Sequence, residues 1–391
     1  MHVTLHLTTA CNFQCSYCYA RPTAKGIDMT KEIVDKAIEF ATAIGGTNIG
    51  IIFFGGEPLL KKDLIRYAVE KCKELEINNK YQSLYHFKIT TNGYLLDEDF
   101  LNFSQFAKIN IGLSLDGNRE AHDANRQQSN GKGTFEHIDT KLDLLLKKQP
   151  YTKIFQVVNP NNVEFYAESV KFFIEKGFKY IISSLNYEGD WTDKNLKELA
   201  NQYKELAKLY KKWTLEERKF YFSPFEMKFA THIRGNDDNC YGCKLSQRQI
   251  SIAPDGLIYP CVQFVKDGIS NKAYSIGNIW DGFNEKRAEL LNESLTEKET
   301  CRECAIKTRC YNTCSCLNYQ TTGTINAVSP LLCTTERMLV PIVDKLGAEL
   351  YKAKAAMFIQ KQYNTVYPLL SMLEDDAKRV IKKSRQDLQQ I

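Results

Sequence analysis

The chain has 391 residues, of which 43% are hydrophobic and 25% are charged. This composition is typical of a soluble globular protein of two or three domains and excludes a largely disordered chain. The net charge of +5 is too small to indicate nucleic-acid binding. The first residues do not form a signal peptide, and no apolar run approaches the roughly 20 residues that cross a bilayer. We therefore expect a cytoplasmic protein that binds neither membranes nor nucleic acid.

The 13 cysteines are the most informative part of the composition. Structural disulfides are rare in the cytoplasm, so metal binding is the expected use for most of these thiols. Three cysteines lie at positions 11, 15 and 18, one at position 72, and nine between positions 240 and 333. Cys72 shares a predicted helix face with apolar residues, so we expect it in the core.

Strands and helices alternate through the first half of the chain. Short apolar or β-branched runs predict strands at residues 3–8, 49–54, 87–91, 109–115, 154–158 and 180–184. Helical periodicity predicts helices at residues 31–43, 63–75, 97–105, 138–147, 163–175 and 195–215, the first of them capped by Thr30. This alternation predicts a parallel sheet covered by helices, either open or curled into an incomplete barrel.

The remainder of the chain has a different pattern. Residues 240–333 combine many cysteines with little periodicity, which indicates a segment that folds around metal. Within it, Asp255-Gly256 between two apolar runs predicts a β-hairpin that brings Cys261 back towards the preceding cysteines.

Beyond residue 335 the pattern is helical again, and we expect Pro341 and Pro368 to interrupt the helices. The last predicted helix carries a group of basic residues, which form either a solvated face or a docking site for an acidic peptide. These residues are Lys378, Arg379, Lys382, Lys383 and Arg385.

Cys11, Cys15 and Cys18 have the spacing C-x3-C-x2-C and follow directly after the first predicted strand. Three thiolates can hold three irons of a [4Fe–4S] cluster and leave the fourth iron open to a ligand. A zinc site would lack its fourth ligand, because His2 and His6 are expected to be ordinary strand residues. The spacing therefore favours an iron–sulfur cluster over zinc.

This loop resembles the cysteine loop of the radical S-adenosylmethionine (SAM) enzymes. The resemblance implies that Cys11, Cys15 and Cys18 hold the catalytic [4Fe–4S] cluster and that Tyr17 packs beside the adenine of SAM. It also implies that SAM is cleaved to methionine and a 5′-deoxyadenosyl radical, which abstracts a hydrogen atom from an unactivated carbon.

Two further motifs at the ends of predicted strands resemble SAM-binding segments of that family. Gly55, Gly56 and Glu57 follow the second strand, where adjacent glycines would let a ligand approach the backbone and Glu57 would accept a hydrogen bond from an amine. Thr91 and Asn92 end the third strand with short polar side chains suited to ligand hydroxyls.

The fourth predicted strand ends in Ser114-Leu115-Asp116-Gly117, followed by His122-Asp123, Arg126 and Gly-Lys-Gly-Thr-Phe. This string resembles radical SAM enzymes that modify peptides and proteins, including the anaerobic sulfatase maturases. The resemblance implies that Ser114 and Arg126 bind the carboxylate of SAM. We expect His122 and Asp123 to shape the loop rather than to act as an acid–base pair.

The second group of cysteines resembles the SPASM domain, a C-terminal extension that holds two auxiliary [4Fe–4S] clusters. Carried over to this chain, the first auxiliary cluster is held by Cys240, Cys243, Cys261 and Cys314, and the second by Cys301, Cys304, Cys310 and Cys333. Two alternatives stay open within this scheme: Cys316 replaces Cys314, or Cys240 is free and leaves an iron open to a substrate sulfur. A pair of zinc sites would need the same number of cysteines.

These patterns and resemblances predict an α/β protein in three parts. A TIM-like partial (β/α)6 barrel is expected in residues 1–235, a Cys-rich iron–sulfur (SPASM) domain in 236–335 and a helical tail in 336–391. The expected cofactors are SAM and three [4Fe–4S] clusters.

The resemblance implies an enzyme that modifies a ribosomally made peptide. In the sulfatase maturases an Asp directly follows the hairpin cysteine and serves as the base, whereas here Val262-Gln263-Phe264 follows Cys261. We therefore favour a Cys-containing precursor peptide and a thioether product. Formylglycine formation, epimerisation and carbon–carbon crosslinking are the alternatives, and a non-catalytic zinc scaffold is the remote one.

We also expect two kinds of protein partner. The chain begins at the first barrel strand, so either a separate leader-binding protein or the basic helical tail is expected to present the peptide. A reductant such as flavodoxin or ferredoxin is expected to supply electrons.

Overall fold

The computed structural model describes residues 1–20, 26–78, 82–235, 245–265 and 272–388, with side chains as far as residue 381. Two of the expected metal ligands, Cys240 and Cys243, lie outside the described residues.

A curved sheet of 11 strands runs through the described residues, in the order β11-β10-β9-β8-β1-β2-β3-β4-β5-β6-β7. Strands β1 to β7 are parallel, β8 is parallel to β1, and β8 to β11 pair antiparallel. The strands are β1 (His2–Thr8), β2 (Asn48–Gly55), β3 (Leu84–Thr91), β4 (Ile109–Ser114), β5 (Lys153–Val158), β6 (Tyr180–Leu185), β7 (Tyr221–Phe222), β8 (Gln249–Ile252), β9 (Leu257–Tyr259), β10 (Gly277–Asn278) and β11 (Gly282–Phe283).

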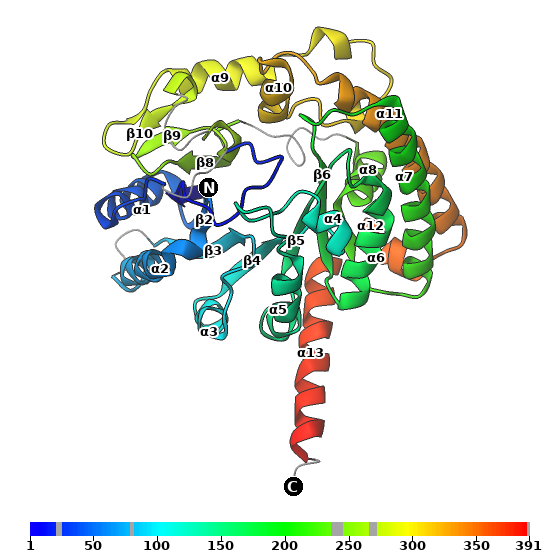
Figure 1. Cartoon of the computed structure of the whole chain (residues 1–391), viewed down its shortest axis with the longest axis horizontal. Coiled ribbons are helices and arrows are strands. Elements are labelled where there is room, and N and C mark those ends of the chain that lie inside the picture. The colour runs from blue at the N-terminus through cyan, green and yellow to red at the C-terminus, as the bar shows by residue number, and fades with distance from the viewer. Residues whose placement is uncertain (21–25, 79–81, 236–244, 266–271, 389–391) are drawn as a thin grey trace.

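Helices lie on the outer side of this sheet and along one flank of the molecule (Figure 1). They are α1 (Lys31–Gly45), α2 (Lys62–Ile77), α3 (Glu98–Phe106), α4 (Arg119–Asp123), α5 (Phe135–Lys148), α6 (Tyr166–Lys176), α7 (Asp193–Leu215), α8 (Ser223–Arg234), α9 (Lys286–Leu295), α10 (Ser315–Thr322), α11 (Pro330–Lys352), α12 (Ala356–Tyr363) and α13 (Tyr367–Leu388). Short 3₁₀ turns include η1 (Pro58–Lys61) and η3 (Val262–Phe264).

The six predicted strands are β1 to β6, and the predicted alternation of strand and helix is confirmed. The sheet is an incomplete barrel rather than a flat open sheet, because it curves and its two edge strands, β11 and β7, do not pair (Figure 1). The predicted hairpin is formed by β8 and β9, and the Thr30 side chain caps α1 by accepting a hydrogen bond from Ile33 N. Cys72 is fully buried in the core, as expected.

Strand β1 illustrates how the barrel divides apolar from polar residues. Val3, Leu5 and Leu7 are fully buried in the apolar core, whereas Thr4, His6 and Thr8 point to the opposite face and are also buried. Burial lowers the pKa of His6 to about 3, so its ring is neutral. A buried polar face of this kind suits an interior that binds polar ligands or water.

One expectation about the C-terminal helices is wrong. Pro341 lies inside α11 and does not interrupt it. A proline removes one backbone hydrogen bond from a helix interior. Around it, Leu339, Val340, Val343 and Leu346 are buried, so tertiary packing offsets the loss.

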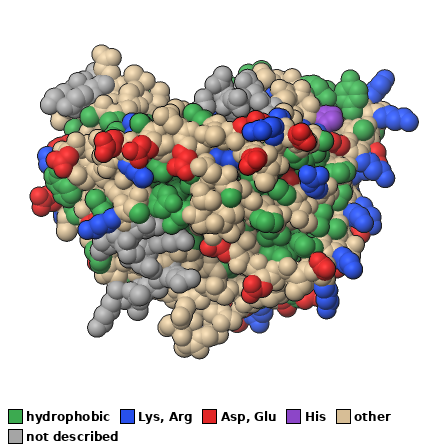
Figure 2. Space-filling view, turned by 90° about the horizontal axis from the view of Figure 1, so that it is seen from above, with side chains coloured by type: hydrophobic (Ala, Val, Ile, Leu, Met, Phe, Trp, Pro, Cys, Tyr) green, Lys and Arg blue, Asp and Glu red, His purple; other side chains and the backbone are tan. Residues whose placement is uncertain are grey.

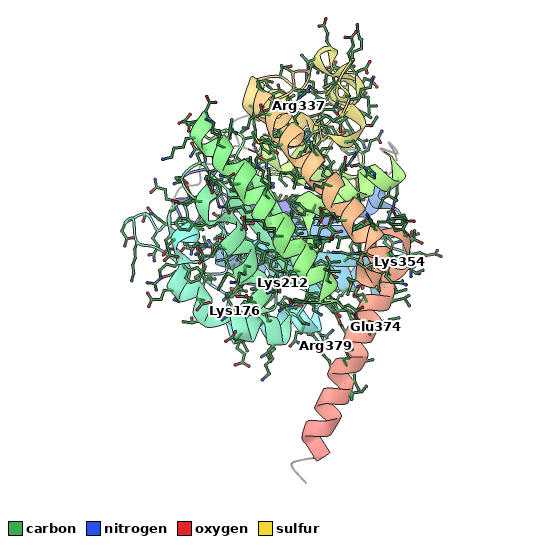
Figure 3. All side chains as sticks on the ribbon, turned by 90° about the vertical axis from the view of Figure 1, so that its right-hand side faces the viewer. Lys176, Lys212, Arg337, Lys354, Glu374 and Arg379 are labelled. Atoms are coloured by element: carbon green, nitrogen blue, oxygen red, sulfur yellow. The ribbon has the colours of Figure 1, made fainter. Side chains whose placement is uncertain are left out.

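A buried ion pair joins the barrel to α11. Lys228 on α8 pairs with Glu336 on α11, and their side chains are only 2% and 7% exposed. Lys228 Nζ also donates to the backbone oxygen of Arg309 at 2.8 Å. The Arg309 guanidinium in turn pairs with Asp344 of α11 at 2.6 Å. These contacts fasten the Cys-rich segment and α11 to the barrel, where α7 and α11 run side by side (Figure 3).

Acidic and basic side chains are interspersed on the face seen in Figure 2, in keeping with the small net charge. The last helix, α13, extends beyond the body of the molecule (Figures 1 and 3). Within the part of the chain that the structure describes, no helix combines the length and the apolar character needed to traverse a bilayer.

Removing one partner of the Lys228–Glu336 pair leaves the other charge buried and unpaired. We expect Lys228→Met to lower the free energy of unfolding by about 3–5 kcal/mol. The double variant Lys228→Met/Glu336→Leu removes both charges and should recover most of this loss. Denaturant unfolding of the three proteins measures both values; a double variant no more stable than the single one would show that the pair is not the cause.

Candidate functional site

Four loops meet at one edge of the sheet, where β1, β2, β3 and β4 end. The loop with the first three cysteines follows β1, Gly55-Gly56-Glu57 follows β2, Thr91-Asn92 ends β3 and Ser114 ends β4. Because these strands are adjacent and parallel, their carboxyl ends lie side by side. This is the edge at which ligands bind in parallel α/β proteins.

The first cysteine loop is anchored at several points along its backbone. Phe13, between the first two cysteines, is buried and packs edge-on against Tyr94. Gln14 N donates to Gln127 O at 2.7 Å, and Ser16 N donates to Asn125 O at 3.0 Å. The loop is therefore positioned by the segment that precedes Gly131-Lys132-Gly133, far away in the sequence.

Burial governs the chemistry of these thiols. It raises the pKa of Cys11 to about 12 and that of Cys15 to about 11, although the nearby Arg126 opposes the shift at Cys15. The thiols therefore stay protonated until a metal displaces their protons. The two side chains and Cys18 lie close enough to interact electrostatically.

Three partly buried thiols on one anchored loop fit an iron–sulfur cluster. Nowhere in the described ranges do three Cys, His, Asp or Glu side chains converge closely enough to hold a single metal ion. The thiolates of an iron–sulfur cluster bind to different irons, so they need not converge on one point. The assignment of Cys11, Cys15 and Cys18 as its ligands remains a prediction.

The structure explains why positions 55 and 56 are glycine, and the explanation differs from the ligand approach that the sequence led us to expect. A Cβ on Gly56 would lie 2.1 Å from Ala10 O, and one on Gly55 would lie 2.3 Å from Thr8 O. Without these atoms, Gly56 N donates to Thr8 O at 2.8 Å and Glu57 N donates to Ala10 O at 2.9 Å. The glycines thus let the backbone approach the start of the cysteine loop.

Glu57 accepts hydrogen bonds from its own loop and from the end of β3. Its buried carboxylate accepts hydrogen bonds from Thr91 Oγ1 at 2.7 Å, Asn92 N at 2.8 Å and Leu59 N at 2.9 Å. Burial nevertheless raises the pKa of Glu57 to about 7. The side chain therefore joins the ends of β2 and β3, a contact that the sequence did not indicate.

Asn92 extends this network to the cysteine loop. Its amide nitrogen donates to Asn12 Oδ1 at 2.9 Å and lies 3.9 Å from Cys11 Sγ. The structure thus brings Glu57, Thr91 and Asn92 together beside the first cysteine. Their contact with a bound ligand remains a prediction.

Asp116 is a site residue that the sequence reasoning did not single out. It is buried, lies 3.0 Å from Arg126 Nε and accepts a hydrogen bond from Tyr17 Oη at 2.6 Å. Burial alone would lower the pKa of Arg126, but Asp116 raises it, so the guanidinium stays charged. The Arg126 guanidinium also lies over the Tyr17 ring, 5.3 Å from its centroid. Asp116 belongs to the motif Ser114-Leu115-Asp116-Gly117, which could have drawn attention to it, but its sequence context indicated no role for this residue.

Ser114 differs from the other predicted ligand contacts. Across the described residues, its hydroxyl makes no hydrogen bond, and it is not fully buried. It lies at the end of β4, two residues before Asp116. Its hydroxyl is therefore available to a ligand.

His122 and Asp123 shape the loop, as expected. His122 Nδ1 accepts a hydrogen bond from Asp116 N at 3.3 Å, and its Nε2 lies 3.0 Å from Thr134 Oγ1. The Asp123 carboxylate accepts hydrogen bonds from Thr134 N and Phe135 N at the start of α5. Both side chains support the segment that holds Arg126.

The described cysteines of the second group, from Cys261 to Cys333, lie at two places. At the first, Cys316 Sγ lies 3.3 Å from Cys261 Sγ and 4.0 Å from Cys314 Sγ. The hydrogen bond from Cys316 lowers the pKa of Cys314 to about 7. Both Cys314 and Cys316 thus lie beside the hairpin cysteine, and the choice between them as ligand stays open.

Four other cysteines lie near one another, around the start of α11. Burial, followed by the thiols of Cys301 and Cys304, raises the pKa of Cys333. Burial raises the pKa of Cys310 to about 12, with Glu336 and Cys333 adding to the shift. These are the four cysteines that the resemblance assigns to the second auxiliary cluster, and their role as its ligands remains a prediction.

Tyr19 connects the two regions of cysteines. Burial, together with the thiols of Cys18, Cys261 and Cys316, raises the pKa of Tyr19. Its side chain therefore lies between the first cysteine loop and the hairpin cysteine. Nothing in the local sequence indicated this position, because the contact joins segments about 240 residues apart.

A cavity of about 220 Å³ lies between the end of β6, α8 and the Cys-rich part. Its lining includes Ser184, Tyr187 and Cys314, together with the Lys228–Glu336 ion pair. It is large enough for a side chain, since a cavity of about 150 Å³ can hold a benzene molecule.

Comparison with known proteins defines the class. Residues 5–174 match the family model of the radical SAM superfamily. The cysteine-type anaerobic sulfatase-maturating enzyme of Clostridium perfringens (strain 13 / Type A) is 25% identical over 317 residues, which span 76% of this chain and 84% of that protein. The chain therefore carries a radical SAM domain, and the protein is an enzyme of this class.

Two solved structures show how far the fold extends. Native anSMEcpe with bound AdoMet has a TM-score of 0.77 at 21% identity, covering 90% of this chain and 99% of that one. Streptococcus suis SuiB bound to precursor peptide SuiA has a TM-score of 0.58 at 17% identity, covering 85% of this chain and 75% of that one. The shared fold with anSMEcpe thus includes most of the Cys-rich part as well as the barrel.

Gly56→Ala tests the backbone contact beneath the cysteine loop. The new Cβ would collide with Ala10 O, so the loop must move, and we expect the iron bound after anaerobic reconstitution to fall by about four atoms per chain, one cluster. Gly347→Ala in α11 is the control, because Gly347 does not have a positive φ and an added Cβ there meets side-chain atoms only, the nearest of them 3.1 Å away on Phe229. A Gly56→Ala protein with its full iron content would contradict this role.

Ser114 and Asp116 should separate ligand binding from stability. Ser114→Ala should change the free energy of unfolding by less than about 0.5 kcal/mol and weaken SAM binding severalfold, since it removes only a hydroxyl left to the ligand. Asp116→Asn leaves the buried Arg126 unpaired and should cost about 3 kcal/mol or more. Calorimetric SAM binding and denaturant unfolding measure the two effects; unchanged SAM affinity in Ser114→Ala would exclude it as a contact.

Proposed function

We propose that this protein is a radical SAM maturase that links a Cys sulfur of a ribosomally made peptide to another residue of that peptide. Its relatives support the peptide as substrate class, because anSMEcpe is known with bound Cp18Cys peptide and SuiB with precursor peptide SuiA. The relatives of known activity mature sulfatases, which are themselves proteins.

In this proposal Cys11, Cys15 and Cys18 hold a [4Fe–4S] cluster, with SAM bound beside it. The cluster and SAM together supply a radical that takes a hydrogen atom from a carbon that side chains cannot activate. The chain's own residues position these groups. Ser114 and Arg126 bind the carboxylate of SAM, and Asp116 holds the guanidinium in place.

The network around Glu57 has a supporting role in this scheme. It connects the ends of β2 and β3 to Asn12 in the cysteine loop, so the loop keeps one position relative to the SAM contacts. Tyr17 is held at its hydroxyl by Asp116, which leaves its ring as the adenine contact. Such fixed positioning is the main contribution that a protein makes to cofactor chemistry.

We assign residues 236–335 to a SPASM domain with two auxiliary clusters, residues 1–235 to the barrel and residues 336–391 to the tail. The first auxiliary cluster uses Cys240, Cys243, Cys261 and Cys314. The second uses Cys301, Cys304, Cys310 and Cys333. These clusters would take up the surplus electron of the reaction or hold a substrate sulfur, and a small electron-carrier protein would reduce the enzyme.

One observation carries the choice of a crosslink over formylglycine. The residues directly after Cys261 form η3, and none of them is a carboxylic acid. Gln263 Oε1 there accepts a hydrogen bond from Gln320 Nε2. A carboxylate base at this position is what oxidation to formylglycine would require by resemblance to the sulfatase maturases.

The cavity beside Cys314 supports a peptide substrate. It lies between the barrel and the Cys-rich part, and its lining combines apolar side chains, such as Leu185, Leu332 and Leu339, with hydroxyl groups and one buried ion pair. We place a substrate side chain there, with the reacting carbon towards the first cysteine loop.

The product identifies the reaction. The reconstituted enzyme is incubated under argon with SAM, a reductant and the peptide encoded by the neighbouring small open reading frame, and the product is analysed by mass spectrometry. A thioether loses two hydrogens and one alkylatable thiol. Formylglycine formed from Cys loses its sulfur, epimerisation incorporates solvent deuterium without loss of mass, and a carbon–carbon crosslink loses two hydrogens but keeps the thiol.

Cys18→Ala is the matched inactive control, and Cys72→Ala is the control cysteine outside the predicted sites. Wild type and Cys72→Ala should bind about twelve irons per chain, and Cys18→Ala about eight, since each [4Fe–4S] cluster contributes four. If the Cys-rich part binds zinc instead of iron, the proposal that it holds two auxiliary clusters of the enzyme is wrong. A product that keeps all its thiols would overturn the thioether.

A further inference from the structure

The amino end of the barrel carries basic side chains that the proposed function does not use. Residues of a strand alternate between two faces, and in this sheet the face opposite the apolar core lines the barrel interior. In the register of the sheet, His2 of β1 lies beside Gly50 of β2, and Gly50 lies beside His86 of β3. Lys88 follows two residues after His86 and therefore faces the same interior.

A second lysine reaches this interior from another strand. Lys153 is the first residue of β5, and its neighbour Ile154 is fully buried in the apolar core, so Lys153 faces inward. Burial, followed by the charge of Lys153, lowers the pKa of Lys88. Burial also lowers the pKa of His2, with further contributions from Lys88, His86 and Lys153. These side chains of three strands therefore lie close enough to interact, and we call His2, His86, Lys88 and Lys153 the basic cluster.

No acidic side chain of the described residues neutralises the two lysines of the basic cluster. Neither Lys88 nor Lys153 forms an ion pair in this part of the chain, and no carboxylate opposes the lowering of the pKa of Lys88. Asp375 of α13, which interacts with the neighbouring Tyr180, is already paired with two lysines outside the basic cluster. The positive charge of the two lysines is thus left uncompensated.

Solvent and small solutes can reach the basic cluster. Along β3, His86 is exposed and Lys88 is half-buried, whereas Phe87 between them is buried in the core. Lys153 is half-buried as well, and Asn110, which pairs with Lys88 in the sheet, is exposed. The ammonium groups are therefore neither sealed in the core nor spread over an open surface.

His2 has hydrogen-bonding capacity that its neighbours do not use. Its ring lies over Gly50, where an added Cβ would be only 1.9 Å from Nδ1. This nitrogen is buried and has no hydrogen-bond partner within the described residues. A buried polar atom without a protein partner is uncommon and is a place where an ion, a ligand or an ordered water binds.

The convergence of two lysines has an energetic cost that a bound anion would offset. Like charges in a partly buried position disfavour each other's charged form, and an opposite charge favours it. Lysine binds phosphate as a compact point charge, and imidazole and amide N–H groups can donate hydrogen bonds to the phosphate oxygens. A phosphate group on a carrier has about two negative charges at neutral pH, which matches the two lysines.

We propose that the basic cluster binds a small anion that carries a phosphate group. Lys88 and Lys153 are its charged contacts, and the two histidines and Asn110 lie around it. The site is at the amino ends of the strands, whereas the first cysteine loop follows the carboxyl end of β1. A strand of six residues, such as β5, separates these two edges by about 20 Å. The proposal therefore does not depend on the proposed function, and either can fail without the other.

Calorimetric titration of the reconstituted full-length enzyme with inorganic phosphate tests this site, with sodium chloride holding the ionic strength constant. We expect one phosphate per chain. Lys88→Met/Lys153→Met should weaken binding about tenfold or more, because it removes both charges while keeping apolar stems of similar length. Lys197→Met/Lys204→Met removes the same charge from two exposed positions of α7 and should leave the affinity unchanged.

Unfolding in urea gives a second readout that a purely structural role would not move. Without phosphate, Lys88→Met/Lys153→Met should unfold at the same urea concentration as wild type or at a higher one, because a repulsion has been removed. Added phosphate should raise the midpoint of wild type and of the α7 control but not that of this variant, since a ligand of the folded state stabilises it. Lys88→Arg/Lys153→Arg keeps both charges and should keep the response to phosphate.

Two carriers of the phosphate group are titrated beside the free ion, adenosine 5′-monophosphate and phosphoserine. Tighter binding of one of them than of inorganic phosphate would support the site and identify the carrier. Equal binding of all three would support a site for the phosphate group alone.

Four outcomes would overturn the proposal. A wild-type enzyme that binds no phosphate excludes the site, and unchanged affinity in Lys88→Met/Lys153→Met places the binding elsewhere. An equal loss in the α7 control would reduce the effect to overall charge. A lower unfolding midpoint of Lys88→Met/Lys153→Met in phosphate-free buffer would show that the lysines stabilise the fold instead of serving a ligand.

Discussion

The arrangement of the site depends on one backbone contact, between Gly55-Gly56 after β2 and residues 8–10 after β1. The two chains approach so closely that a single methyl group on Gly56 would overlap Ala10 O. Two hydrogen bonds across this contact hold the start of the cysteine loop. The parallel pairing of β1 with β2 brings the segments together, and the absence of a side chain lets them touch. The loop can then present its thiols at the edge where the neighbouring strands end.

Two buried ion pairs likewise connect separate segments of the chain. The Asp116–Arg126 pair, with Tyr17 against it, ties the end of β4 to the cysteine loop. The Lys228–Glu336 pair ties α8 to α11 and so the barrel to the Cys-rich part. A buried ion pair contributes little net stability, but loss of one partner is costly, so such pairs specify one arrangement of the segments that they join. Both pairs lie beside predicted cofactor ligands, where a fixed arrangement matters most.

Regular structure was largely predictable because it depends on local patterns. Strands β1 to β6 and the longer helices that follow them, with the exception of the short α4, follow from apolar runs and helical periodicity. The Asp255-Gly256 hairpin follows from its turn residues. The prediction at Pro341 was wrong because the cost of a proline inside a helix is visible in the local sequence. The burial of the residues around it depends on the tertiary structure and is not. The partners of Glu57 and the role of Asp116 were missed for the same reason. Apart from Leu59, these partners lie at least 10 residues away, and no spacing rule connects them.

The sequence by itself determined the class of chemistry, since cysteine spacing records which thiols can share a cluster within one loop. It also determined the order of strands and helices, because hydrophobic period is a property of consecutive residues. Only the tertiary structure decided why Gly56 must lack a side chain and which polar groups near the site are already paired. It also decided that apolar residues of α13 such as Leu373 and Val380 are exposed. These properties arise where separate strands and helices meet, and the distances between such segments are set by packing rather than by their separation along the chain.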